Sequence, residues 1–146
     1  MDVAQLKADL LRDEALRVVV YDDGTGRPLK AGGGLTGHPS FGVGHNGEKP
    51  LSLRAVQVIL EDDIADVTDA LDRALPWWRT LSENRQRALA NMAFNLGIVR
   101  LLGFRDMLAC LEAGDWKGAA TASLDSRWAA QVGERARRIA QILEEG

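Results

Sequence analysis

The chain has 146 residues, 46% of them hydrophobic, and a formal net charge of −3. This length suits one globular domain, and the weakly acidic balance excludes a strong overall signal for nucleic-acid binding. Cys110 is the only cysteine, which excludes an intramolecular disulfide. The first ten residues contain no long apolar run, so the sequence predicts neither a signal peptide nor a membrane span.

The N-terminal third alternates between short elements and glycine-rich turns. Apolar residues at helical spacing predict a first helix that ends near Leu16, and a β-branched run predicts a strand over residues 18–21. Residues 22–26 are typical of a turn, and several glycines follow in the loop that leads to Pro39. A second strand is expected over residues 40–45, so the two strands should form a small hairpin sheet.

The rest of the chain has the pattern of a helical protein. Helical spacing predicts a long helix over residues 53–74, with Ser52 as its cap and Pro76 just beyond its end. Residues 83–96 are apolar on nearly every side apart from Asn91, which predicts a buried central helix. Glycines separate the further helices, which are expected over residues 101–112, 115–123 and 134–143.

Three residues near the first turn suggest acid–base chemistry. Glu14 lies at the end of the first helix, where the negative end of the helix dipole and the neighbouring Asp13 favour the protonated carboxyl that a general acid needs. Asp23 supplies a carboxylate in the turn, and Ser40 supplies a hydroxyl where the second strand begins. Each also has an ordinary interpretation: a solvated glutamate, a turn-forming aspartate and a plain strand serine.

Four motifs follow one another along nearly the whole chain. They are L-R-D-E-A-L-R-V-V-V-Y-D-D at residues 11–23, S-F-G-V-G-H at 40–45, N-M-A-F-N-L-G at 91–97 and S-R-W-A-A-Q-V-G-E-R-A at 126–136. Each motif is modest alone, but their ordered series is specific. The series resembles the phage-type lysozymes of glycoside hydrolase family 24.

The resemblance implies an α+β, lysozyme-like fold in a single domain over residues 1–146. A small hairpin-sheet lobe would occupy roughly residues 14–60, and a larger helical lobe would occupy residues 75–146. The long helix would join the two lobes, and the N-terminal helix would pack on the C-terminal lobe.

The resemblance also implies which residues form the site. The family's catalytic Glu, Asp and Thr match Glu14, Asp23 and Ser40, so a serine stands where the family usually has threonine. The residues that match the family's sugar cleft are Asn46, Phe94 and Asn95. Supporting roles fall to Arg135, expected to orient Glu14, and to an ion pair between His45 and Asp63.

One segment differs in length from the family pattern. The family usually has five residues between its Asp and its hydroxyl residue, whereas sixteen residues, 24–39, separate Asp23 from Ser40 here. Because sixteen residues cannot form the same tight turn, we expect a flap beside the cleft that is mobile at residues 32–34.

The implied activity is that of an endolysin, a bacteriophage muramidase that hydrolyses the β-1,4 bond between N-acetylmuramic acid and N-acetylglucosamine in bacterial peptidoglycan. Acid catalysis with an activated water needs no cofactor and no metal. The protein would act as a monomer, wait in the host cytoplasm and reach the periplasm and cell wall through a holin. Two alternatives stay open: a lytic transglycosylase that cuts the same bond without water, and a non-catalytic domain that binds the wall.

Overall fold

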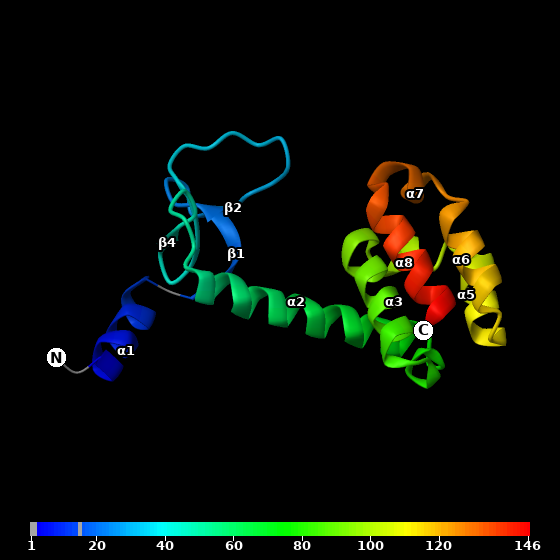
Figure 1. The fold of residues 1–146 in the computed structure, drawn as a ribbon. Coiled ribbons are helices and arrows are strands. Elements are labelled where there is room, and N and C mark those ends of the chain that lie inside the picture. The colour runs from blue at the N-terminus through cyan, green and yellow to red at the C-terminus, as the bar shows by residue number, and fades with distance from the viewer. Residues whose placement is uncertain (1–2, 15) are drawn as a thin grey trace. The chain divides into compact units, whose positions relative to one another are not determined.

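The computed structural model describes residues 3–14 and 16–146, except for the side chains of Asp9 and Glu14. The chain divides into two compact units, residues 1–53 and 54–146 (Figure 1). The first contains a small sheet and the second is helical, as expected for an α+β lysozyme-like fold.

The first unit begins with helix α1, Val3–Glu14, and continues into a four-stranded sheet. The strands are β1 (Arg17–Asp22), β2 (Arg27–Pro28), β3 (Pro39–Gly42) and β4 (His45–Asn46). Their order is β2-β1-β3-β4, with every neighbouring pair antiparallel. The predicted first helix and first strand are therefore confirmed, and the central strand β1 carries the turn residues at its end.

The predicted second strand over residues 40–45 was wrong, because a turn divides it into β3 and β4. Gly42 and Gly44 have φ angles of 65° and 64°, which β-branched and most other residues avoid. The turn folds β4 back onto β3, so that Asn46 pairs with Ser40 and His45 with Phe41. The alternation of residue types could not reveal this reversal.

The helical unit contains both of the long helices that the sequence predicts, with the predicted bounds. These are α2, Leu53–Ala74, and α3, Glu83–Leu96, and a short 3-10 helix, Trp78–Thr80, lies between them. Ser82 caps α3 by accepting a hydrogen bond from the Arg85 N–H at 3.3 Å. None of the described helices is both long and apolar enough to cross a membrane.

Five shorter helices follow α3, where the sequence predicted three. The break at Gly103 divides the region expected as a helix over residues 101–112, and residues 127–132 form a helix that the periodicity did not indicate. The observed helices are α4 (Ile98–Leu101), α5 (Arg105–Ala113), α6 (Trp116–Leu124), α7 (Arg127–Val132) and α8 (Glu134–Glu145).

The core of this unit surrounds one face of α3. Leu89 and Met92 on that face are fully buried and belong to one cluster with Leu71, Trp78, Leu101, Met107, Leu111 and Leu143. The prediction that α3 is buried on all sides was wrong, because Asn91 and Asn95 are exposed and Phe94 is 45% exposed. The open face of α3 is therefore free to take part in a site.

Polar contacts fasten α8 to α3. The Arg85 side chain donates from Nε to the Leu143 carbonyl at 2.8 Å and from Nη2 to the Glu144 carbonyl at 2.9 Å. Its guanidinium also lies 3.9 Å from the centre of the Trp116 ring. These contacts satisfy carbonyls at the end of α8, and they fix this helix, which carries Arg135, relative to α3.

A buried carboxylate closes the long loop between β1 and β3. Asp22 is 4% exposed, and its Oδ1 accepts hydrogen bonds from the N–H groups of Gly24 at 3.0 Å and Gly37 at 2.8 Å. Its Oδ2 accepts a third bond from the Thr36 N–H at 2.9 Å. The Thr36 bond is the largest cause that lowers the pKa of Asp22, and the Gly37 and Gly24 bonds add to it while burial opposes them. We call these four residues the neck.

The neck also leaves no room for side chains. A Cβ on Gly24 would lie 2.8 Å from the Gly37 nitrogen, closer than such atoms approach in proteins. A Cβ on Gly37 would overlap the Asp23 carboxylate. Glycine is needed at both positions because two backbone segments meet here, with the Asp22 carboxylate between them.

We expect Asp22→Asn to loosen the neck. The asparagine amide would meet the Thr36 N–H donor to donor, so hydrogen exchange of the Thr36 and Gly37 amides should be on the order of tenfold faster. The folded pKa of Asp22 lies below its unfolded value, so its contribution to stability is present above about pH 4 and is lost as pH falls through the folded pKa.

Thermal unfolding between pH 2 and pH 7 should therefore separate parent from variant at neutral pH and bring them together at the acid end. Asp125→Asn removes an equal charge from an exposed position and serves as the control. Equal exchange rates in Asp22→Asn and the control would contradict the role of the neck.

Candidate functional site

Asp23 and Ser40 lie on neighbouring segments at one end of the sheet. Tyr21 is paired with Ser40 and Asp22 with Pro39, and the Asp23 N–H donates to the His38 carbonyl at 3.0 Å. This register puts Asp23 and Ser40 on the same face as diagonal neighbours, a relation with a typical Cα separation of about 7–8 Å. The longer loop therefore leaves these two residues close together.

The orientation of Asp23 is fixed by a second bond. Its Oδ1 accepts from the His38 N–H at 2.6 Å, while its side chain stays exposed. The His38 ring in turn lies within hydrogen-bond distance of Glu48, with 2.8 Å between Nδ1 and Oε2. An exposed carboxylate with one oxygen held and the other bonded to no described residue suits the positioning of a water molecule.

Ser40 is 3% exposed and forms no side-chain hydrogen bond within the described part of the chain. It lies between Tyr21 on β1 and Asn46 on β4. The side chain of Asn46 is held in place by a hydrogen bond, in which its Oδ1 accepts from the Glu48 N–H at 2.8 Å. The sheet thus brings the predicted residues Asp23, Ser40 and Asn46 into one small region.

The predicted acid, Glu14, is the last residue of α1. Its side chain lies outside the described part of the structure, so the prediction of its role rests on its position at the helix end.

His45 packs its ring against Phe41, with 4.9 Å between the ring centres. Its Nε2 is buried and has no hydrogen-bond partner among the described residues. A buried ring nitrogen without a hydrogen-bond partner costs free energy on the order of 1–3 kcal/mol. A hydrogen bond from this nitrogen to an acceptor would remove that cost. Asp63, the expected partner, lies in the other unit, and the ion pair stays a prediction.

In the helical unit, the open face of α3 forms a cavity of about 370 Å³ with α2 and α8. Phe94 and Arg135, two of the predicted site residues, both line it, and Leu60, Ile64 and Val67 provide its apolar wall. Arg135 donates from Nε and Nη2 to Oδ1 of Asn91 at 3.0 and 2.8 Å. The cavity combines an aromatic ring, apolar side chains and a guanidinium, as ligand pockets commonly do.

Two asparagines on this face of α3 are held in one orientation. Asn91 accepts from Arg135, and Asn95 accepts from the Trp128 Nε1–H at 2.7 Å. Neither NH₂ group donates to another described residue, so each remains available to donate toward a ligand. They lie four residues apart on one side of the helix, and Phe94 lies beside Asn91 in the lining of the cavity.

Sequence reasoning missed two residues that matter here, Asp22 and Asn91. The sequence places Asp22 in a turn and does not indicate that it closes the loop, although the D-D-G run offers two carboxylates on opposite faces of a strand end. Asn91 was read as an interruption in an apolar helix. Its spacing of four residues from Asn95 is the signal that could have identified it.

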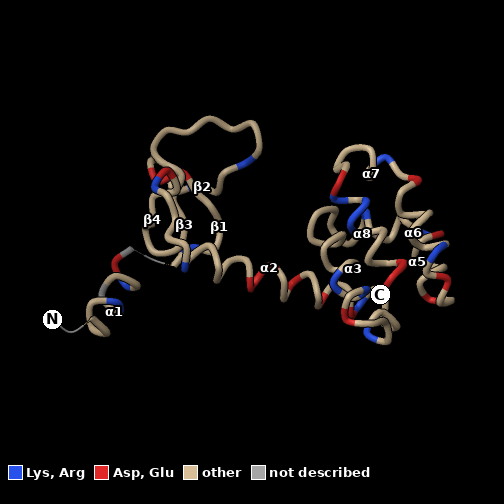
Figure 2. Tube along the Cα trace, in the orientation of Figure 1, with Lys and Arg blue, Asp and Glu red and all other residues tan. Residues whose placement is uncertain are grey.

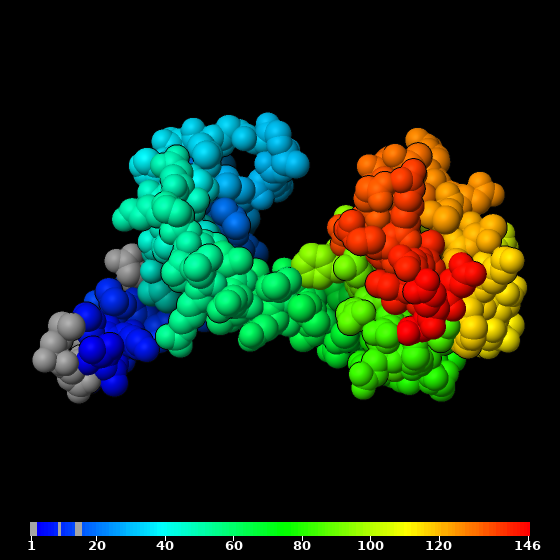
Figure 3. Space-filling model, viewed as in Figure 1, coloured from blue at the N-terminus to red at the C-terminus, as the bar shows by residue number. Residues whose placement is uncertain are grey.

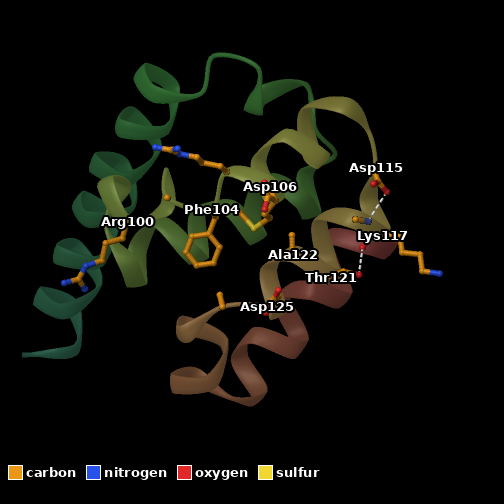
Figure 4. Close-up of a pocket in the computed structure, with 13 residues that line it drawn as sticks. Arg100, Phe104, Asp106, Asp115, Lys117, Thr121, Ala122 and Asp125 are labelled. Atoms are coloured by element: carbon orange, nitrogen blue, oxygen red, sulfur yellow. Dashed lines mark hydrogen bonds between the residues drawn. The ribbon is translucent and has the colours of Figure 1, made fainter.

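A further cavity of the helical unit, about 710 Å³, lies along α5 and α6 (Figure 4). Its lining includes the basic residues Arg100, Arg105 and Lys117, the acidic residues Asp106, Asp115 and Asp125, and the ring of Phe104. None of the predicted site residues lines it. Within the described residues, no group of three or more His, Cys, Asp or Glu side chains is arranged to hold a metal ion.

Comparison with known proteins gives the family. The phage lysozyme family matches residues 12–141. The chain is 29% identical to the pre-baseplate central spike protein Gp5 of Enterobacteria phage T4 over 94% of its own length and 27% of that protein. It is 33% and 28% identical to the probable T4-type lysozymes 2 and 1 of Dictyostelium discoideum, over 47% and 62% of its own length. The matches cover 41% and 55% of those two proteins, so the chain spans about a quarter to a half of the relatives that it matches.

Because the family match takes in most of the chain, residues 12–141, the protein belongs to the phage lysozyme family.

Proposed function

We propose that this protein hydrolyses bacterial peptidoglycan at the β-1,4 bond between N-acetylmuramic acid and N-acetylglucosamine. The observation that carries the proposal is the family match over residues 12–141, which includes every residue of the proposed site. Glu14 protonates the leaving oxygen, Asp23 stabilises the positive charge that develops on the sugar, and Ser40 holds the attacking water with Asp23.

The geometry of the sheet supports these roles. Asp23 and Ser40 share a face of adjacent segments, and the Ser40 hydroxyl makes no bond to another described residue. A serine without a base is a poor nucleophile, but its hydroxyl is a good partner for a water molecule. Hydrolysis with inversion needs a water at this point, between the carboxylate and the sugar.

The helical unit supplies the proposed sugar-binding groups. Phe94 offers a ring for stacking, and the free NH₂ groups of Asn91 and Asn95 can donate to acetamido carbonyls of the glycan. Arg135, already held by Asn91, orients the acid. On the sheet side, Asn46 contributes a further polar contact.

Peptidoglycan is the proposed partner, and the protein acts as a monomer without cofactor or metal. A holin releases it from the host cytoplasm to the periplasm and wall. Mass spectrometry of digested peptidoglycan tests the reaction class: hydrated reducing ends support hydrolysis, anhydro ends would mean a lytic transglycosylase, and no products would mean a binding domain.

We expect Glu14→Gln to keep the fold and to lower wall-lysing activity by on the order of 10²- to 10⁴-fold, because the amide cannot donate the proton that the leaving oxygen needs. Turbidity loss of a cell-wall suspension measures the rate, and circular dichroism checks the fold. Glu144→Gln, at an exposed position of α8, is the control. A folded Glu14→Gln variant with activity within tenfold of the parent would rule out the acid role.

We expect the first-formed reducing end to be the α-anomer, since a water attacking from the Asp23 side inverts the β-linkage. Proton NMR of a defined oligosaccharide during the first minutes of digestion, before mutarotation, measures the anomer. If the β-anomer appears first, the reaction retains configuration, and the water-holding role of Ser40 in the first step must be abandoned.

We expect His45 and Asp63 to be coupled. The buried, unpartnered His45 Nε2 favours an acceptor at that point, and replacing either residue should lower stability more than activity. A double-mutant cycle with His45→Asn and Asp63→Asn, followed by thermal unfolding, measures the coupling. Removing one partner should cost about 3–5 kcal/mol if the pair is buried and under about 1 kcal/mol if it is exposed. Strictly additive effects would exclude the pair.

A further inference from the structure

The loop between β1 and β3 encloses a cavity of its own. Its volume is about 500 Å³, and its lining includes Arg27, Lys30, Thr25 and Thr36. Figure 3 shows the blue and cyan atoms of this loop around a hollow. The cavity lies wholly within the first unit, and its lining contains none of the proposed catalytic residues, so the proposed catalytic roles do not account for it.

The walls of this cavity are fixed at several points. The neck closes its base through Asp22, and β2 holds Arg27 opposite Asp22 in the sheet. The Leu29 N–H donates to the Val20 carbonyl at 2.9 Å. Arg17 donates to the Gly26 carbonyl at 3.0 Å, with its guanidinium 4.5 Å from the centre of the Tyr21 ring. These contacts fix the two ends of the loop, from Arg27 to Leu29 and at the neck, and leave the expected mobility of residues 32–34 as a prediction.

The charges on this loop are all positive. Arg27 and Lys30 are the only charged residues among 24–37, and Figure 2 shows no acidic position along the outer part of the loop. Neither side chain forms an ion pair or hydrogen bond within the described residues, in contrast to Arg79 and Arg137. The one carboxylate in the lining, Asp22, has both oxygens occupied by backbone N–H groups.

Two unpaired cations facing one cavity favour an anionic ligand. The substrate proposed above carries such groups in every repeat, since the peptides attached to muramic acid bear carboxylates. A cavity of about 500 Å³ exceeds a lone carboxylate and falls within the range of pockets that hold part of a larger ligand. The hydroxyl of Thr36 can bond the neighbouring peptide groups.

We propose that this loop cavity is a subsite that binds a peptide carboxylate of peptidoglycan through Arg27 and Lys30. The proposal rests on the proposed function, and it assigns to the loop a role in substrate affinity rather than in the chemical step. Charge-assisted bonds that are equally strong in ground and transition states lower KM and leave kcat unchanged.

The test compares Arg27→Gln/Lys30→Gln with a control, Lys49→Gln/Arg73→Gln, which removes the same charge from exposed positions outside the cavity. On polymeric peptidoglycan we expect the KM of the loop variant to rise by on the order of tenfold, with kcat within about twofold of the parent. The control should match the parent. An unchanged KM in the loop variant would overturn the proposal.

A second substrate identifies the group that is bound. Peptidoglycan whose carboxylates have been converted to amides with carbodiimide and methylamine should raise the parent's KM to that of the loop variant. A difference between parent and variant that persists on the amidated wall, or that appears only with phosphate-bearing wall polymers, would contradict carboxylate binding.

Direct binding separates this proposal from the proposed function. Titration of the ¹⁵N-labelled parent with N-acetylmuramyl dipeptide should shift amide signals of residues 24–37, and the loop variant should lose these shifts. If the parent releases no fragments from peptidoglycan but shows these shifts, the proposed hydrolysis fails and the subsite stands. If the parent cleaves the wall and the shifts are absent, the subsite fails alone.

Discussion

One carboxylate determines the geometry of the sheet unit. Asp22 accepts hydrogen bonds from three N–H groups at positions 24, 36 and 37, and so joins chain segments that a loop separates. The entropic cost of closing a loop grows only slowly with its length, so a long insertion is tolerable if its ends are pinned. Burial of an acceptor with both oxygens satisfied avoids the penalty for an unpaired charge. With the loop closed in this way, the strands β1 and β3 at its two ends can keep their register.

The elements that could be predicted from sequence are those with strong local signals. α2 and α3 have long helical periodicity, and α3 has a serine cap and a glycine end, so their bounds follow from the chain itself. The turn between β3 and β4 could not be predicted, because glycine is equally compatible with a strand and with positive φ. The short helix α7 has too few turns to establish a period.

The site was harder to predict because neighbouring residues of one type have different environments. Asp22 and Asp23 are identical in sequence terms, yet one is buried as the acceptor of the neck and the other is exposed beside His38. A shift of one residue along a strand changes the face, so register decides which carboxylate is structural and which can do chemistry. Register depends on long-range hydrogen bonds, which a single sequence does not display.

Asn91 was missed for a related reason. The hydrophobic pattern of an apolar helix shows that a polar residue interrupts it, but does not show which residue that side chain contacts.

The position of the loop relative to the neck explains how the loop can be long without disturbing the proposed chemistry. Residues 25–35 lie beyond the pairs Tyr21–Ser40 and Asp23–His38, on the far side of the Asp22 bonds. Changes in the loop therefore do not need to move Asp23 relative to Ser40. A segment with this freedom can acquire contacts to distant parts of a polymeric substrate, whereas the residues before the neck stay constrained by the sheet. The hydrogen bonds to Asp22 therefore allow the proposed division of roles, in which Asp23 and Ser40 stay fixed for catalysis and the loop contributes affinity for the substrate.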